Sequence, residues 1–242
     1  MEKSTSIIDY SVVIPIYNEQ DNIAPLLCEL EETMKSLTSS WELIFVDDGS
    51  TDRSGIVIEE LAASRPFLKY LRFKKNTGQS AALDAGFKAA CGAVVITLDG
   101  DGQNDPKDIP ALVAALYTGY DLIAGKRVGR KDTWYKRLIS KMANYARKCV
   151  LDDTASDTGC SLKIYRRDAL RQIRLYKGMH RFLPALFVIH GFTVKEMAVT
   201  HRPRLRGSSK YGLFNRGFSL VCDLMAVAWM KKRQLSYQIE QK

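Results

Sequence analysis

The sequence predicts an α/β fold in which a mostly parallel central sheet is flanked by helices. Short apolar segments rich in β-forming residues alternate with segments of helical periodicity through the first half of the chain, which is typical of βαβ units. Polar clusters at residues 17–19, 47–52 and 99–103 each follow a predicted strand. Open α/β sheets bind ligands at that edge, so we expect the functional site there.

The apolar pattern places the elements in order. Residues 11–16 form the first strand, and a helix follows behind a cap at Asp21 or Asn22. The spacing predicts further strands at 42–46, 68–73, 93–98 and 121–125, and helices at 56–63, 79–90 and 109–116. After residue 127 the pattern becomes irregular and more basic, so we expect one domain with an elaborated C-terminal third.

Composition limits the class of protein. With 46% hydrophobic residues the 242-residue chain can bury a core, and its net charge of +9 predicts an anionic partner: nucleic acid, a phosphorylated substrate or an anionic lipid surface. The five cysteines lack metal-ligand spacing, which predicts reduced thiols and favours the cytosol. Residues 1–10 lack a secretory apolar region and the run 218–230 is short for a bilayer, so we expect no membrane crossing.

Asp99 and Asp101 flank a glycine directly after an apolar strand, so two carboxylates converge at a tight turn that a ligand can approach closely. Hard oxygen ligands of this kind suit Mg²⁺ or Mn²⁺ bound together with substrate phosphates. A solvated Asp-Gly turn is the alternative for such a short motif. The neighbouring motifs favour the metal site.

Four motifs occur in order: Ile14-Pro-Ile-Tyr-Asn-Glu19, Val46-Asp-Asp-Gly-Ser-Thr-Asp52, a segment over residues 76–86, and Leu98-Asp-Gly-Asp-Gly-Gln103. Over residues 10–212 the chain resembles the family 2 inverting glycosyltransferases of the GT-A fold. It is most similar to polyprenyl-phosphate glycosyltransferases, including dolichol-phosphate mannose synthases and bacterial enzymes that load sugars onto undecaprenyl phosphate. The resemblance implies a catalytic domain at 1–212 and an amphipathic C-terminal helix and tail at 213–242.

The resemblance also implies roles for the residues of these motifs. Asp101 and Gln103 match the main metal ligands, and Asp99 matches a residue that contacts the sugar-nucleotide and supports the metal. Tyr17 could instead pack, and residues 47–52 could cap the next helix through Asp52 or Ser50. For Asp47 we favour a structural role. The donor site of a UDP- or GDP-linked sugar would comprise Pro15, Tyr17, Glu19, Asp48, Asp99, Gly100, Asp101, Arg127, Arg204 and Lys210.

Basic residues and one acid complete the implied site. Arg127, Arg204 and Lys210 match residues that contact the donor diphosphate or the acceptor phosphate, where cations stabilise the departing charge. Asp157 matches a catalytic acid that acts as a base toward hydroxyl acceptors. A lipid phosphate, with a second pKa of about 6, is already anionic near neutrality, so Asp157 could orient the acceptor or a basic neighbour instead. Asp152 and Asp153 are nearby alternatives.

Two segments are candidates for membrane contact. From Trp134 to Val150 the sequence is apolar on one helical face and basic on the other, which suits an anionic membrane surface or a buried stripe in the core. The segment from Phe218 to Arg233 is the second candidate. Many relatives continue from here into two transmembrane helices, so we expect a peripheral enzyme, docked to a membrane-protein partner, or a truncated chain.

The sequence therefore predicts metal-dependent transfer of a sugar from a nucleoside-diphosphate sugar to undecaprenyl or dolichyl phosphate, with inversion, at the cytoplasmic face of a membrane. A hydroxyl acceptor in envelope glycan synthesis is the alternative. A processive polysaccharide synthase is disfavoured because no Arg-Trp pair occurs, and a nucleotidyltransferase because its Gly-rich loop is missing. A nucleic-acid-binding module lacks aromatic stacking motifs, so we expect no nucleic-acid partner. The intact acidic set argues against an inactive sensor.

Overall fold

In the computed structural model, residues 8–37, 39–128, 156–203 and 214–235 are described. Their strands form one seven-stranded sheet of order β3-β2-β1-β4-β6-β5-β7. All of these strands run in one direction except β6, which is antiparallel to both of its neighbours. The strands are β1 (Tyr10–Ile16), β2 (Trp41–Asp47), β3 (Leu68–Arg72), β4 (Val94–Thr97), β5 (Leu122–Arg127), β6 (Lys163–Arg166) and β7 (Val194–Val199).

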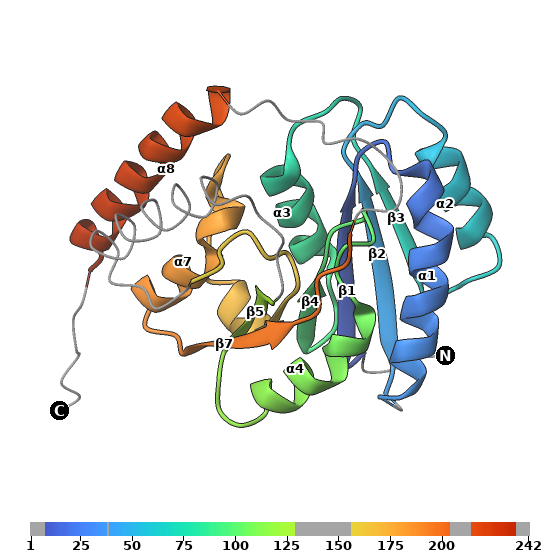
Figure 1. Ribbon diagram of the computed structural model, residues 1–242, viewed down its shortest axis with the longest axis horizontal. Helices are drawn as coiled ribbons and strands as arrows, with labels where there is room; N and C mark the ends of the chain where they lie inside the picture. Colours follow the sequence, from blue (N-terminus) through green and yellow to red (C-terminus); the bar gives the residue numbers. More distant parts are fainter. Residues whose placement is uncertain (1–7, 38, 129–155, 204–213, 236–242) are drawn as a thin grey trace, which may run out of the picture.

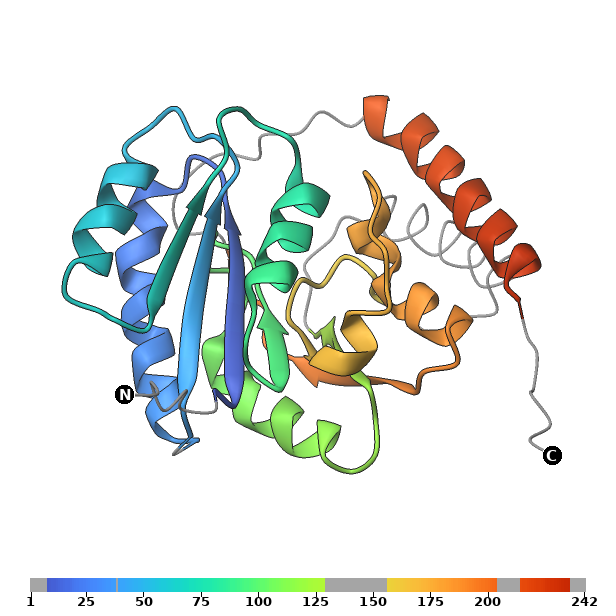
Figure 2. The same cartoon turned by 180° about the vertical axis from the view of Figure 1, so that it is seen from behind.

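Helices cover both faces of the sheet (Figures 1 and 2), as expected of strands that are apolar on both sides. One face is covered by α1 (Gln20–Lys35), α2 (Ser54–Ala62), the 3₁₀ turn η1 (Pro106–Asp108) and α4 (Ile109–Leu116). The other is covered by α3 (Gln79–Ala89), α6 (Arg167–Leu170), the 3₁₀ turn η2 (Met179–Phe182), α7 (Leu183–Ile189) and α8 (Phe214–Arg233).

Each face has its own hydrophobic core. Ile14 of β1 and Leu27 of α1 are fully buried in the first core, and Val13 and Phe187 are fully buried in the second. Because successive residues of a strand point to opposite faces, Val13 and Ile14 contribute to different cores. Val227 of α8 is also buried in the second core, so the C-terminal helix packs onto the sheet domain.

The elements predicted from periodicity are confirmed, and α4 has the expected bounds. The predicted cap of the first helix is wrong, because α1 begins at Gln20 and places Asp21 and Asn22 within its first turn. The backbone N–H of Gln20 donates instead to Oδ2 of Asp52, 3.3 Å away on the neighbouring loop. A long-range contact thus replaces the local cap.

Several expectations fall on residues that the structure does not describe. The segment from Trp134 to Val150, Arg204 and Lys210 lie outside the described residues, as do Asp152 and Asp153. Cys28, Cys91, Cys160 and Cys222 are free thiols. Within the described ranges, no helix combines the length and the apolar character needed to cross a membrane.

Candidate functional site

The loops that follow β1 and β2 are tied together at the carboxyl edge of the sheet. The backbone N–H of Asn18 donates to Oγ of Ser50 at 2.9 Å, and Oδ1 of Asn18 accepts from the backbone N–H of Thr51 at 2.7 Å. Asn18 adopts a left-handed conformation, with φ of 53°, to make this turn. Tyr17 and Glu19, predicted to bind the donor, are half-buried in the loop that these hydrogen bonds fix.

Asp47 and Asp48, at the end of β2, are both buried. Asp47 accepts from the backbone N–H of Ser50 at 2.7 Å and from the hydroxyl of Tyr70 at 3.1 Å, so its expected structural role is confirmed. Asp48 accepts from the backbone N–H groups of Thr77 at 2.6 Å and Gly78 at 2.8 Å. Its carboxylate therefore holds the turn that begins α3, and its donor contact stays a prediction.

The acidic loop, residues 99–103, follows β4 and crosses the end of β1. Gly100 makes this close approach possible, because a Cβ there would lie 2.4 Å from Cδ1 of Ile16. Oδ1 of Asp99 accepts from Nε2 of Gln79 at 2.7 Å, and the backbone N–H of Asp99 donates to Ser161 at 3.1 Å. Asp99 is therefore oriented from both α3 and the segment before β6.

Electrostatics in the acidic loop favour a bound cation. Burial, and next the negative charge of Asp101, raise the pKa of Asp99 to about 6. In the part of the chain that the structure describes, no three His, Cys, Asp or Glu side chains gather as a metal cluster. Two carboxylates that repel each other nonetheless fit Mg²⁺ or Mn²⁺, which commonly takes one or two protein carboxylates and completes its shell with substrate phosphate oxygens.

Gln103 joins the acidic loop to the segment after β7. The side-chain Nε2 of Gln103 donates to the backbone carbonyl of Arg202 at 3.5 Å. The backbone carbonyl of Gln103 accepts from the backbone N–H of Arg202 at 2.9 Å. The guanidinium of Arg202 pairs with Asp105 at 2.6 Å and with Glu29 at 2.7 Å. The chain leading toward residue 204 is thus anchored beside the predicted metal ligands.

Arg127 and Asp157 form a bidentate ion pair. Nε and Nη2 of Arg127 donate to the two carboxylate oxygens of Asp157 at 2.8 and 2.7 Å, and the backbone N–H of Arg127 donates to Oδ2 at 3.1 Å. Burial acts to lower the pKa of Arg127, but the hydrogen bond and charge of Asp157, together with the charges of Cys160 and Asp99, raise it overall. Glu196 of β7 accepts from the backbone N–H of Asp157 at 3.0 Å, which fixes the turn.

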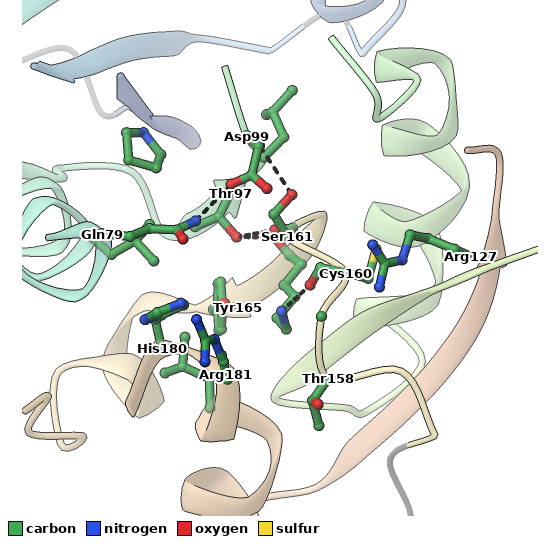
Figure 3. Close-up of a pocket in the computed structure, with 16 residues that line it drawn as sticks. Gln79, Thr97, Asp99, Arg127, Thr158, Cys160, Ser161, Tyr165, His180 and Arg181 are labelled. Atoms are coloured by element: carbon green, nitrogen blue, oxygen red, sulfur yellow. Dashed lines mark hydrogen bonds between the residues drawn. The ribbon is translucent and has the colours of Figure 1, made fainter. Parts of the chain in front are cut away.

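A cavity of about 350 Å³ lies between the acidic loop and η2 (Figure 3). It brings together three of the predicted residues, Pro15, Asp99 and Arg127, whereas Asp157 reaches it through its pairing with Arg127. Sequence reasoning gave no role to the larger polar side chains that complete the lining. They are Gln79, Lys163, His180 and Arg181.

The missed residues had little signal in the sequence. Gln79 lies within the third motif, and Lys163 opens a strand that ends in basic residues. His180 and Arg181 belong to no motif, and only the fold brings η2 against α3. There Nδ1 of His180 lies 2.7 Å from Oγ of the buried Ser80.

Comparison with known proteins gives consistent matches. The model of glycosyl transferase family 2 matches residues 11–174. Dodecaprenyl-phosphate galacturonate synthase of Rhizobium johnstonii is 40% identical over 230 residues, covering 93% of this chain and 68% of the relative. Undecaprenyl-phosphate 4-deoxy-4-formamido-L-arabinose transferase of Edwardsiella ictaluri is 38% identical, covering 89% and 66%. The chain thus spans about two thirds of the length of these relatives.

Solved structures share the fold at low identity. Glucosyl-3-phosphoglycerate synthase from Mycobacterium tuberculosis, in complex with Mg²⁺ and UDP, superposes with a TM-score of 0.70 at 19% identity, covering 92% of this chain and 80% of that one. A mannosyltransferase from Pyrobaculum calidifontis, in complex with GDP-Man and Mn²⁺, gives 0.63 at 17%, covering 97% and 67%. The predicted GT-A architecture is confirmed.

Proposed function

The chain belongs to glycosyl transferase family 2, and from this premise we propose that it transfers the sugar of a nucleoside-diphosphate sugar to a polyprenyl phosphate, with inversion at the anomeric carbon. One observation carries the proposal: the acidic loop opens onto a cavity whose wall includes Arg127. Asp99, which would contact the donor, and Arg127, which would contact phosphate, then line the same cavity, and the reaction would take place between them. The relatives named for polyprenyl-phosphate products support this acceptor class.

In this proposal the donor lies along the carboxyl edge of the sheet. The donor is a UDP- or GDP-linked sugar, and its nucleoside is surrounded by Pro15, Tyr17, Glu19 and Asp48. The loops after β1 and β2 are fixed to each other because the backbone N–H of Asn18 donates to Oγ of Ser50. A rigid pocket binds its ligand without the cost of ordering loops.

Asp99, Asp101 and Gln103 would hold Mg²⁺ or Mn²⁺, which when bound neutralises charge on the donor diphosphate. The chain's own residues then position the reactants. Asp99 is oriented by Gln79, 2.7 Å away, and faces the sugar from the cavity wall. Arg204 and Lys210 would contact the diphosphate, continuing from the segment that Arg202 anchors.

The reaction needs no protein base. An oxygen of the acceptor phosphate, already anionic near neutrality, attacks the anomeric carbon and forms the new C–O bond. The bond from that carbon to the donor diphosphate breaks, and its electron pair leaves with the nucleoside diphosphate. Arg127, held by Asp157, stabilises phosphate charge in this step. Asp157 thus serves catalysis by orienting Arg127.

We also propose that the enzyme works at the cytoplasmic face of a membrane, as a peripheral protein or beside a membrane-protein partner. Residues 1–212 form the catalytic domain, and residues 213–242 contribute the contact surface. The observation behind this surface is the exposure of Val221, Met225 and Trp229 on α8. The segment from Trp134 to Val150 would add a second contact.

The decisive experiment incubates the protein with UDP- and GDP-sugars, Mg²⁺ or Mn²⁺ and undecaprenyl phosphate, and analyses the lipid fraction by mass spectrometry. We expect a lipid-linked sugar with at least one donor, and none in EDTA. Asp101→Asn should abolish turnover and keep the melting temperature, whereas Asp84→Asn, at a half-buried residue of α3 that pairs with Lys88, should remain active. Transfer to a hydroxyl acceptor alone, with no lipid phosphate product from any donor, would show that the acceptor assignment is wrong.

A further inference from the structure

Lys163 is a buried cation on the wall of the cavity. Its side chain is 4% exposed, and it lies on β6 two residues before Tyr165, so both side chains point to the same side of the sheet. Its Nζ donates to the carbonyl of Cys160. Among the described residues, no carboxylate lies within ion-pair distance of it, and Asp157 is already paired with Arg127.

A buried ammonium without a carboxylate in direct contact is unfavourable. Charged groups inside proteins are normally paired, because removing an ion from water costs several kcal/mol. A methionine would fill a similar volume at this position without that cost. Burial lowers the pKa of Lys163, and the more distant charges of Asp99 and Asp157, which act in the opposite direction, do not offset it. An anion in the cavity would supply a direct ion-pair partner.

The rest of the lining has the same character. Arg181 lines the cavity from η2, and the neighbouring His180 is hydrogen-bonded to Ser80 of α3. Figure 3 shows His180 and Arg181 on one side of the cavity and Arg127 on another, with Asp99 above them in this view. Asp99 is the one carboxylate of the described lining and belongs to the acidic loop. The remaining charged wall is cationic.

We propose that Lys163 and Arg181 bind an anionic oxygen group of a substrate in this cavity, either the carboxylate of a uronic-acid donor or the phosphate of the lipid acceptor. The proposal rests on the proposed function, because both sources assume that the cavity is the transfer site. A sugar joined to a nucleotide held at Asp99 would reach the cavity with its ring. An acceptor phosphate would have to approach the same carbon, so either anion comes close to Lys163.

The test uses Lys163→Met and Arg181→Gln, with Lys88→Met as matched control, because Lys88 is exposed on α3 and pairs only with Asp84 among the described residues. The donor arm measures binding of UDP-glucuronate and UDP-galacturonate against UDP-glucose and UDP-galactose by calorimetry with Mg²⁺. GDP-sugars replace them if the wild type binds guanine. The acceptor arm measures binding of farnesyl phosphate, and the KM for undecaprenyl phosphate.

If the anion is a sugar carboxylate, each cavity variant loses at least about tenfold in affinity for uronate donors only, as expected for a charged hydrogen bond. If it is the acceptor phosphate, the loss appears only in the acceptor arm and is the same for every donor. The control keeps wild-type values in both arms.

Wild-type values for both cavity variants in both arms would overturn the proposal. If Lys163→Met fails to fold, unchanged values for Arg181→Gln alone would overturn it too, because Arg181 is half-buried and its replacement leaves β6 intact. Failure of the proposed function is a separate result, in which the wild type yields no lipid-linked sugar. The binding measurements need no turnover and still give an answer.

Discussion

The Arg127–Asp157 pair connects β5 to the turn before β6, and its two side chains are only 16% and 17% exposed. Such a pair is geometrically specific, because two parallel hydrogen bonds fix the plane of the guanidinium. Gly159 adds to this fit, since a Cβ there would lie 2.7 Å from Nη2 of Arg127. The orientation of the Arg127 guanidinium therefore depends on Asp157 and on the absence of a side chain at Gly159.

We predict that Arg127→Gln and Asp157→Asn each lower kcat/KM by about 100-fold, since either change leaves a half-buried charge unpaired or removes the phosphate contact. The double variant should be about as slow as the slower single variant, because the two residues act as one unit. Steady-state kinetics of the four proteins measures this coupling. Losses that multiply to about 10⁴-fold would mean that Asp157 has a separate role, such as a base.

The acidic loop could be predicted from sequence because it follows a predicted strand at the carboxyl edge, and Arg127 because it matches a residue of the family that the chain resembles. Lys163 and Arg181 could not, because their meaning depends on burial and on the approach of η2 to α3. A lysine in a strand and an arginine in a short turn are ordinary surface residues until the fold encloses them. Gln79 lies within the third motif, residues 76–86, but nothing in the sequence indicates that its side chain contacts Asp99.

At the level of elements, α8 has two faces of different kinds. Val227 is buried against the sheet domain, whereas Val221, Met225 and Trp229 are 58%, 65% and 63% exposed at a spacing of four residues. Residues four apart share one face of a helix, so these side chains form one apolar stripe. Lys231, Lys232 and Arg233 follow at its end, which suits an anionic lipid surface.

We predict that Met225→Glu together with Trp229→Glu abolishes most binding to vesicles containing phosphatidylglycerol. Each side chain loses about 1.5–3 kcal/mol of burial in the lipid interface, so binding should fall at least about 100-fold. Co-sedimentation measures the bound fraction. Ile56→Glu is the control, since Ile56 is 49% exposed on α2 across the sheet. Equal sedimentation of the α8 variant and the wild type would exclude this stripe as the contact.

The first five strands and four helices follow from periodicity because each is a local pattern with a clear apolar face. The insertion of antiparallel β6 between β4 and β5 was not predictable, since the run that contains Lys163 carries no local sign of its neighbours. The first residue of α1 was misplaced for a related reason. The backbone N–H of Gln20 donates to Asp52 on the loop after β2, and no residue near Gln20 in the sequence indicates that contact.

At the scale of the whole molecule, the site joins distant parts of the chain. Residues from α3, the acidic loop, β5, β6 and η2 line one cavity, and Arg202 ties the segment after β7 to Glu29 of α1. A ligand bound at this junction favours the folded state over the unfolded chain. Its effect on melting therefore reports on the assembled site without any need for turnover.

We predict that UDP or GDP stabilises the protein only when Mg²⁺ or Mn²⁺ is present, since the diphosphate and the acidic loop repel each other without the cation. At a ligand concentration of 100 times Kd the gain is about 2.7 kcal/mol, which raises the melting temperature by about 5–10 °C for a chain of this size. Differential scanning fluorimetry with and without EDTA measures the shift. Asp101→Asn should lose the cation-dependent part, whereas Asp84→Asn should retain it because Asp84 pairs with Lys88 on α3. A nucleotide shift that persists in full with EDTA would place the diphosphate away from Asp99 and Asp101.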